Sequence, residues 1–288
     1  MSDHMQKRRQ QGKPELLAPA GGWEQLRYTI AYGADAVYLA AGRFGMRQHA
    51  DNFTVEEMPE VVDYCHSRGV DVHATVNIVM HESDIDVLPE YLRALDAAGV
   101  DAAIVSDMGV AAMLKEYAPH IALHVSTQCS VSNSQAARMW HSLGAKRIVC
   151  AREMTVEDIA RMHDEIPADL ELEAFVHGSM CMAVSGRCLI SDCLTGRSAN
   201  KGDCAQPCRW EYMLSEHRHP DVYYPIEQDA RGTYVMNAQD LNMLSHLDEL
   251  ERAGIDSFKI EGRNKKAFYV ATVVNAYRQL IDGADPES

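Results

Sequence analysis

The sequence has 288 residues and a formal net charge of −15, and 47% of its residues are hydrophobic. This length suits one (β/α)8 barrel, which commonly needs about 250 residues, better than two domains of average size. No run of about 18 apolar residues is present, which argues against a transmembrane helix. The acidic charge argues against a protein that coats nucleic acid along its whole surface.

The first 14 residues are basic and lack the apolar stretch of a secretory signal. We therefore interpret residues 1–14 as a disordered basic arm and expect a cytoplasmic protein. Disulfides are rare in the cytosol, so the eight cysteines of the chain need another explanation. Clustered cysteines in such a protein more often bind a metal or take part in catalysis.

A short phrase of glycine, a small or apolar residue and a polar residue recurs along the chain, as in Gly69-Val70-Asp71 and Gly99-Val100-Asp101. Each copy follows an amphipathic stretch and precedes an apolar run. Glycine suits the C-terminal end of a helix, because it adopts the left-handed conformation there without strain. Together with three similar apolar runs, the phrases predict eight strands at 16–18, 36–39, 72–76, 102–105, 121–125, 147–150, 170–176 and 257–260.

Apolar residues at spacings of three and four predict helices between these strands. Thr155 is the expected N-cap of one of them. Alternating strands and helices indicate a parallel sheet, and eight units indicate a closed (β/α)8 TIM-like barrel over residues 15–283, with its active site at the C-terminal ends of the strands. An open doubly wound sheet is the alternative, although no glycine-rich nucleotide motif follows any strand. The predicted helices are 23–32, 55–67, 84–98, 108–117, 134–143, 156–163, 240–253 and 265–281.

One connection is far longer than the others. Residues 177–239 follow the seventh predicted strand and contain five of the eight cysteines. A loop of this length inside a compact domain is usually functional. By the barrel rule, this cysteine-rich insertion lies over the C-terminal mouth.

The cysteine spacing within the insertion predicts a metal centre. Cys181 and Cys188 are seven positions apart, and Cys204 and Cys208 are four apart. Four thiolates suit either Zn²⁺ or an iron–sulfur cluster. The first pair is wider than the usual zinc spacing, which favours a cluster, while Zn²⁺ stays open for protein isolated in air. Cys193 is then a spare thiol, and a group of buried thiols without metal is the remaining alternative.

The stretch from Glu173 to Ser191 resembles the signature of peptidase family U32, the collagenase-like family. The pattern is E-x-F-x-x-G-[SA]-x-C-x(4)-G-x-C-x-x-S, and every fixed position is present. The segments ELLAPAG from Glu15 and KIEGR from Lys259 resemble the opening and closing strands of that family. The resemblance covers about residues 15–283.

This resemblance implies an oxygen-independent hydroxylation protein that holds a 4Fe–4S cluster on four cysteines. Different branches of the family hydroxylate the wobble uridine of tRNA, with prephenate as the source of oxygen, or a ribosomal RNA cytidine, or act as a pair in anaerobic ubiquinone synthesis. The segment CRWEY from Cys208 resembles the tRNA branch, which makes a tRNA anticodon loop the expected partner. A peptidase with a cysteine-based or metal-based site, and a subunit of a two-protein pair acting on a small molecule, are the alternatives. By position, the cluster ligands are Cys181, Cys188, Cys204 and Cys208.

Polar residues at the strand ends are the other candidates for the site. Arginine suits bidentate recognition of a carboxylate or phosphate, so we expect Arg47, Arg152 and Arg263 to bind an anionic substrate. His177 or Glu173 is the candidate acid or base, although a carboxylate inside a strand also suits a structural role. Basic residues near the insertion predict a positive mouth that holds RNA phosphates. The further candidates for substrate binding are Asn77, Gln128, Glu261 and, by stacking on a base, Trp210.

Overall fold

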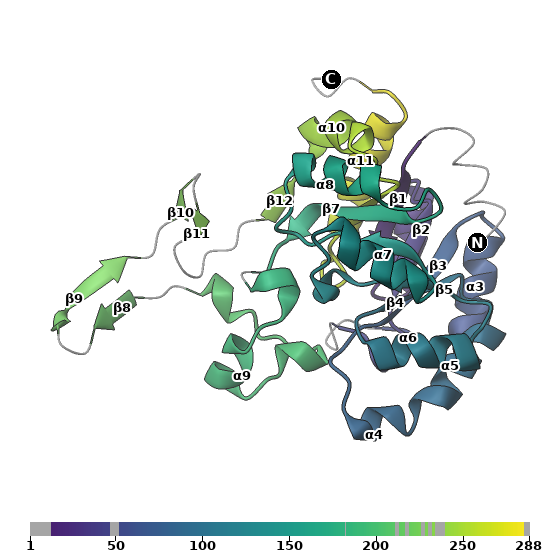
Figure 1. Ribbon diagram of the computed structural model, residues 1–288, viewed down its shortest axis with the longest axis horizontal. Coiled ribbons are helices and arrows are strands. Elements are labelled where there is room, and N and C mark those ends of the chain that lie inside the picture. Colours follow the sequence, from purple (N-terminus) through teal and green to yellow (C-terminus); the bar gives the residue numbers. More distant parts are fainter. Residues whose placement is uncertain are drawn as a thin grey trace.

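The computed structural model describes residues 13–46, 52–181, 183–210, 213–216, 219–225, 228–229, 232–233 and 240–284. Most of the basic arm and the candidate Arg47 lie outside this part of the chain. Eight parallel strands close into a barrel, since β1 pairs with both β2 and β13, and β7 pairs with both β6 and β13 (Figure 1). All eight predicted strands are confirmed: β1 (Glu15–Pro19), β2 (Ala36–Leu39), β3 (Asp71–Val76), β4 (Ala102–Val105), β5 (Ala122–Val125), β6 (Ala145–Val149), β7 (Glu171–Ser179) and β13 (Ser257–Ile260).

Helices cover the outside of the barrel, as predicted (Figure 1). The side chain of Thr155 accepts a hydrogen bond from the backbone N–H of Asp158 at 3.2 Å, which confirms the N-cap of α8. The outer helices are α2 (Trp23–Ala31), α3 (Met58–His66), α4 (Glu82–Ile85), α5 (Leu88–Ala97), α6 (Met108–Tyr117), α7 (Ser134–Ser142), α8 (Val156–Glu165), α10 (Leu247–Arg252) and α11 (Ala267–Ile281).

Two helix predictions were wrong. The stretch 84–98 is two helices, α4 and α5, because α5 begins afresh with Pro89 in its first turn. The stretch 240–253 begins as a strand, β12 (Asp240–Asn242), which pairs antiparallel with the extended end of β7. The short helix α10 starts only at Leu247, because residues 240–242 satisfy their backbone groups in this added strand instead.

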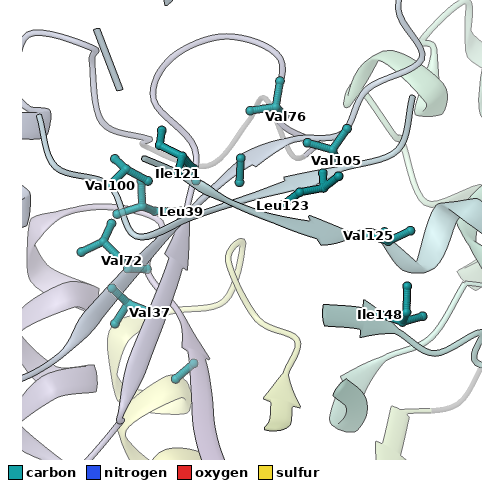
Figure 2. Close-up of a cluster of buried hydrophobic side chains, with 14 of the residues drawn as sticks. Val37, Leu39, Val72, Val76, Val100, Val105, Ile121, Leu123, Val125 and Ile148 are labelled. Atoms are coloured by element: carbon teal, nitrogen blue, oxygen red, sulfur yellow. The ribbon is translucent and has the colours of Figure 1, made fainter. Parts of the chain in front are cut away.

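Alternate residues of each strand face outward and pack against the helices. Figure 2 shows this layer, in which Val37, Val72 and Leu123 lie among other branched side chains. These residues are at most 4% exposed, which removes nearly all of their apolar surface from water. The outer layer is therefore the main hydrophobic core.

The inward-facing residues form a smaller apolar group and an unusually polar one. Leu17, Ala36, Tyr38 and Ile104 make a separate apolar cluster. The buried polar side chains on the strands include Glu15, His73, His124, Arg147, Glu171, Glu173, Ser257 and Lys259. Barrel interiors are usually filled by branched apolar residues, so a charged interior suggests a requirement other than packing.

The long connection leaves β7 and returns at β12. Its first part, residues 180–210, lies beside the barrel and contains α9 (Ile190–Thr195) and short 3-10 turns; we call this segment the cysteine loop. Two hairpins follow, β8 (Met213–Glu216) with β9 (His219–Pro225) and β10 (Gln228–Asp229) with β11 (Gly232–Thr233), and both are set apart from the barrel in Figure 1. Within the described residues, no helix is long and apolar enough to span a membrane.

Candidate functional site

A cavity of about 120 Å³ opens at the C-terminal ends of the strands, under the cysteine loop. This is where (β/α)8 enzymes place their active sites. The space is large enough for several water molecules or a small organic group. The predicted site residues that line it are Asn77, Gln128, Arg152, Cys181, Cys188, Cys204, Glu261 and Arg263.

Three cationic side chains contribute to the cavity wall. The guanidinium of Arg263 is almost fully buried and donates to the hydroxyl of Thr75 at 2.9 Å. The guanidinium carbon of Arg152 lies 4.2 Å from the centre of the Phe175 ring. Lys259 is 4% exposed, and its ammonium lies 4.7 Å from the ring centre of Tyr38. With Glu261 as the carboxylate of this wall, the cavity favours an anionic ligand.

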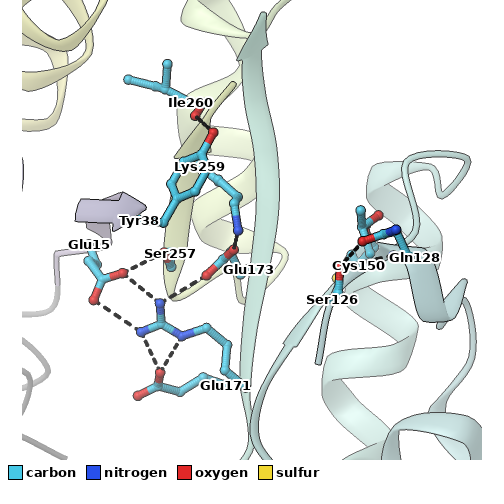
Figure 3. Close-up of polar contacts among 12 residues, drawn as sticks. Glu15, Tyr38, Ser126, Gln128, Cys150, Glu171, Glu173, Ser257, Lys259 and Ile260 are labelled. Carbon is cyan, nitrogen blue, oxygen red and sulfur yellow. Dashed lines mark hydrogen bonds and ion pairs between the residues drawn. The ribbon is translucent and has the colours of Figure 1, made fainter. Parts of the chain in front are cut away.

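Below the cavity, Lys259 joins a buried ionic network inside the barrel. Its ammonium donates to Oε1 of Glu173 at 2.7 Å, and the other carboxylate oxygen accepts from Arg147 at 3.1 Å (Figure 3). Arg147 also binds Glu15 at 2.6 Å and Glu171 at 2.8 Å. Glu173 therefore lies in the barrel interior and does not line the cavity. This position suits a structural carboxylate.

The network fixes the charge state of its members. Burial tends to raise the pKa of Glu173, but Lys259 and Arg147 outweigh burial, so this pKa lies below its ordinary value. For Glu15 the same balance, with Arg147 as the main partner, gives a pKa of about 2. Burial lowers the pKa of Lys259, and Glu173 opposes that change. A lysine held in this way at a cavity wall can give or hold a proton more readily than an exposed one.

Polar groups after β3 and β5 complete the wall. Asn77 accepts a hydrogen bond from the backbone N–H of Met46 at 3.2 Å and so fixes the neighbouring turn. Ser126 caps the turn Thr127–Cys129, and its hydroxyl donates to Oε1 of Gln128 at 3.2 Å (Figure 3). The Nε2 group of Gln128 is buried and has no hydrogen-bond partner among the residues that the structure describes. A ligand with a hydrogen-bond acceptor at this position would therefore remove the free-energy cost of burying this amide group without a partner.

Three of the four predicted metal ligands share the cavity wall. The sulfur of Cys188 accepts the backbone N–H of Ile190 at 3.4 Å, and the sulfur of Cys204 accepts that of Gln206 at 3.3 Å. The backbone of Ala183 makes the equivalent bond to Cys181, where it opposes the increase in thiol pKa that burial causes. Each of these cysteines thus receives an amide from two residues further along the chain. Amide donors of this kind stabilise thiolates, the form that binds metals.

The fourth predicted ligand is not among the residues that line the cavity. Cys208 belongs to the turn Pro207–Arg209 and does not line the cavity. Among the residues that the structure describes, no group of three His, Cys, Asp or Glu side chains is close enough to hold a single metal ion. The thiols therefore share a region of the protein and do not form a closed mononuclear site.

Polar contacts hold the cysteine loop against the barrel. Ser185 of the loop donates two hydrogen bonds to Glu153, which follows β6. The backbone carbonyl of Asn200 accepts a hydrogen bond from the backbone N–H of Val79 at 2.9 Å. At the far end, Asp240 of β12 binds Arg209 at 3.0 Å and Lys265 at 3.6 Å. The loop is thus fixed to several strand ends around the mouth.

The sequence as a whole settles the family. A model of peptidase family U32 matches residues 21–288. The chain belongs to peptidase family U32. The stretch around Cys181 and Cys188 that resembles the family signature lies within the matched residues, and both cysteines line the cavity at the barrel mouth.

Named relatives of this U32 chain include proteins that act on RNA. It is 43% identical over 279 residues to tRNA hydroxylation protein P1 of Bacillus subtilis, covering 96% of this chain and 65% of that one. It is 37% identical to a 23S rRNA 5-hydroxycytidine synthase of Escherichia coli, covering 93% and 39%. It is also 35% identical to a collagenase of Porphyromonas gingivalis, covering 93% and 65%. The chain spans 65% of the length of the Bacillus subtilis relative and 64% of that of a tRNA hydroxylation protein P of Helicobacter pylori.

The fold of the U32 chain is also found in a solved structure. A U32 peptidase matches it with a TM-score of 0.55 and 16% identity, over 86% of this chain and 93% of that one. At this identity the likeness supports the barrel fold alone.

The other predicted site residues of the U32 chain lie elsewhere. His177 does not line the cavity. Its Nδ1 lies 3.3 Å from the hydroxyl of Tyr277, and burial lowers the pKa of the imidazole. Trp210 is 47% exposed on the cysteine loop, so its ring is accessible to a partner, but it does not line the cavity. Arg47 falls outside the described residues.

Two residues of the site were not among the predicted site residues. Lys259 was not predicted as a site residue, although a lysine between the apolar residues of a strand indicates a charge that faces inward. Glu153 was not predicted as a site residue either. Nothing in the sequence indicated that it bonds to Ser185, because that contact joins two distant loops.

Proposed function

We propose that this chain is the barrel of an oxygen-independent RNA hydroxylase that forms 5-hydroxyuridine at the wobble position of tRNA. The observation that carries this proposal is the shared cavity wall, where Cys181, Cys188 and Cys204 face Lys259 and the arginines. The RNA-hydroxylating relatives support the same reaction class.

The residues of the cysteine loop fit an iron–sulfur cluster. Three thiols meet at one cavity, and each sulfur has a backbone amide to stabilise its thiolate form. In the proposal, Cys181, Cys188, Cys204 and Cys208 hold a 4Fe–4S cluster. A cluster binds each thiolate to a different iron, so its ligands stand farther apart than those of one Zn²⁺. When bound, the cluster supplies redox or Lewis-acid chemistry at this wall.

The chain's own residues would bind and orient the reactants. Arg152 and Arg263 suit the carboxylates of a small co-substrate such as prephenate. Lys259 would hold a proton on Nζ at the cavity floor, with Glu173 fixing the position of the ammonium. Trp210, exposed beside the mouth, offers a face on which a splayed base of the anticodon loop can stack.

The test is to express the chain in a strain that cannot hydroxylate its wobble uridines, and to analyse tRNA nucleosides by mass spectrometry. We expect 5-hydroxyuridine derivatives to return with the wild-type chain and to stay absent with Cys204→Ala. Cys193→Ala is the matched control, because Cys193 is exposed on the same loop and does not line the cavity. Restored modification in the Cys204→Ala strain would contradict the proposal.

A peptidase is the second candidate, since one relative is named a collagenase. A thiol peptidase needs a cysteine paired with a histidine. The nearest histidine in sequence to Cys181 is His177, which instead bonds to Tyr277 and does not line the cavity. We therefore expect no hydrolysis of gelatin by the purified protein, and gelatin hydrolysis that is lost in Cys181→Ala would favour the peptidase.

A further inference from the structure

The carboxylate of Glu153 connects the barrel to the segment between Cys181 and Cys188. Glu153 lies just after β6, next to Arg152 of the cavity wall. Its Oε1 accepts the backbone N–H of Ser185 at 2.8 Å, and its Oε2 accepts the hydroxyl of Ser185 at 3.0 Å. Both carboxylate oxygens are thus used on one residue of the cysteine loop.

Ser185 is held in a conformation that serine rarely adopts. Its φ is 47° and its ψ is 29°, in the left-handed region, and the next residue, Gly186, also has a positive φ. A residue other than glycine persists in this region only when its surroundings determine it. Ser185 is completely buried, and the two bonds from Glu153 are the contacts that fix it.

The turn at Ser185 sets the path of the chain between two proposed ligands. Ser185 lies four residues after Cys181 and three before Cys188, and all three line the cavity. If the turn relaxed to an ordinary conformation, the two sulfurs would no longer face the same space. Side chains that hold metal ligands from behind commonly change metal affinity about tenfold to a hundredfold when removed.

We propose that Glu153 is a positioning residue that clamps the Cys181–Cys188 segment onto the barrel mouth through Ser185, so that both thiols are arranged before the metal centre assembles. This inference rests on the proposed function in one respect, namely that these cysteines bind a cluster. Its physical content, an ordered turn in the metal-free protein, is independent of the reaction. Glu153 is itself exposed, so its role does not include core packing.

The test compares Glu153→Ala with the wild-type protein after anaerobic reconstitution with ferrous iron and sulfide. We expect the variant to lose its iron to a chelator about ten to a hundred times faster. In the metal-free protein, iodoacetamide should alkylate Cys181 and Cys188 about tenfold faster than in the wild type, as measured by mass spectrometry. The thermal unfolding midpoint should not change, which separates positioning from a general loss of stability.

Three further variants sharpen the result. Glu157→Ala removes an exposed carboxylate four residues away on α8, and it should behave as wild type in both measurements. Glu153→Gln keeps an acceptor for the backbone N–H of Ser185 and should restore most of the iron retention. Ser185→Gly removes the hydroxyl but adopts the left-handed conformation without strain, so it should retain iron better than Ser185→Ala.

Wild-type iron retention together with wild-type alkylation rates in Glu153→Ala would overturn the clamp. If the folded wild-type protein takes up no iron at all, the cluster in the proposed function fails. The alkylation rates of the metal-free proteins would then still decide whether Glu153 orders the turn.

Discussion

Arg147 is the centre of the barrel interior. Its guanidinium is 1% exposed and binds three carboxylates, those of Glu15, Glu171 and Glu173. Neither the period of the strand nor its composition reveals this, because Lys146 and Arg147 are adjacent bases and only one of them faces inward. The register of the closed barrel makes that choice, with Lys146 exposed and Arg147 buried.

We predict that Arg147→Met destabilises the protein by about 3–5 kcal/mol, because it leaves buried carboxylates without their shared cation. Lys146→Met is the matched control in the same strand. Its partner Asp169 is exposed, so the change should cost less than about 1 kcal/mol. Urea denaturation measures both free energies of unfolding, and equal values for the two variants would contradict the role of the network.

The network also predicts how stability depends on pH. The pKa of Glu15 is about 2 in the folded protein, against an ordinary value of 4.5, so the folded state favours the ionised form. The resulting stabilisation is present above about pH 4.5 and is lost as the pH falls toward 2. The free energy of unfolding of Glu15→Gln should therefore change less than that of the wild type between pH 5 and pH 3. An unchanged slope in the variant would show that Glu15 does not carry this effect.

At the scale of elements, the eight barrel strands and their closure were predictable, whereas the added strand β12 was not. The recurring glycine phrases located strands such as β2 and β3, because the left-handed glycine and the buried apolar run are both local properties. The strand β12 was misassigned as part of a helix, since its pairing partner is the end of β7, about 60 residues earlier in the chain. The cysteines were recognisable from their spacing, whereas Lys259 and Glu153 act through contacts between distant segments.

Gly178 controls how β7 passes into the cysteine loop. Its φ is +107°, and an added Cβ would lie 2.5 Å from the backbone oxygen of Glu261. We predict that Gly178→Ala costs more than about 1 kcal/mol and displaces the strand end that leads to the loop. Gly196→Ala is the control, because Gly196 has a similar positive φ with no atom within 4 Å. Comparable losses of stability, measured by urea denaturation, would mean that backbone strain alone explains the effect.

At the scale of the whole molecule, the barrel and the cysteine loop have different roles, since the barrel supplies the stable fold and the loop supplies the thiols at the cavity. The apolar outer layer stabilises the fold, which leaves the interior and the mouth free to carry charge. The chain has a net charge of −15, yet the cationic side chains of Arg152, Lys259 and Arg263 line one cavity. In the proposed function, these cationic groups would let an acidic protein bind an anionic co-substrate and one RNA loop at its mouth.

We propose an iron–sulfur cluster where the cysteine loop meets the barrel cavity. Its most direct test is the metal content and visible absorption of the full chain after anaerobic purification and reconstitution. We expect a brown protein with about four irons per chain, and loss of the colour in Cys204→Ala. A colourless, folded protein that binds only Zn²⁺ under the same conditions would contradict it.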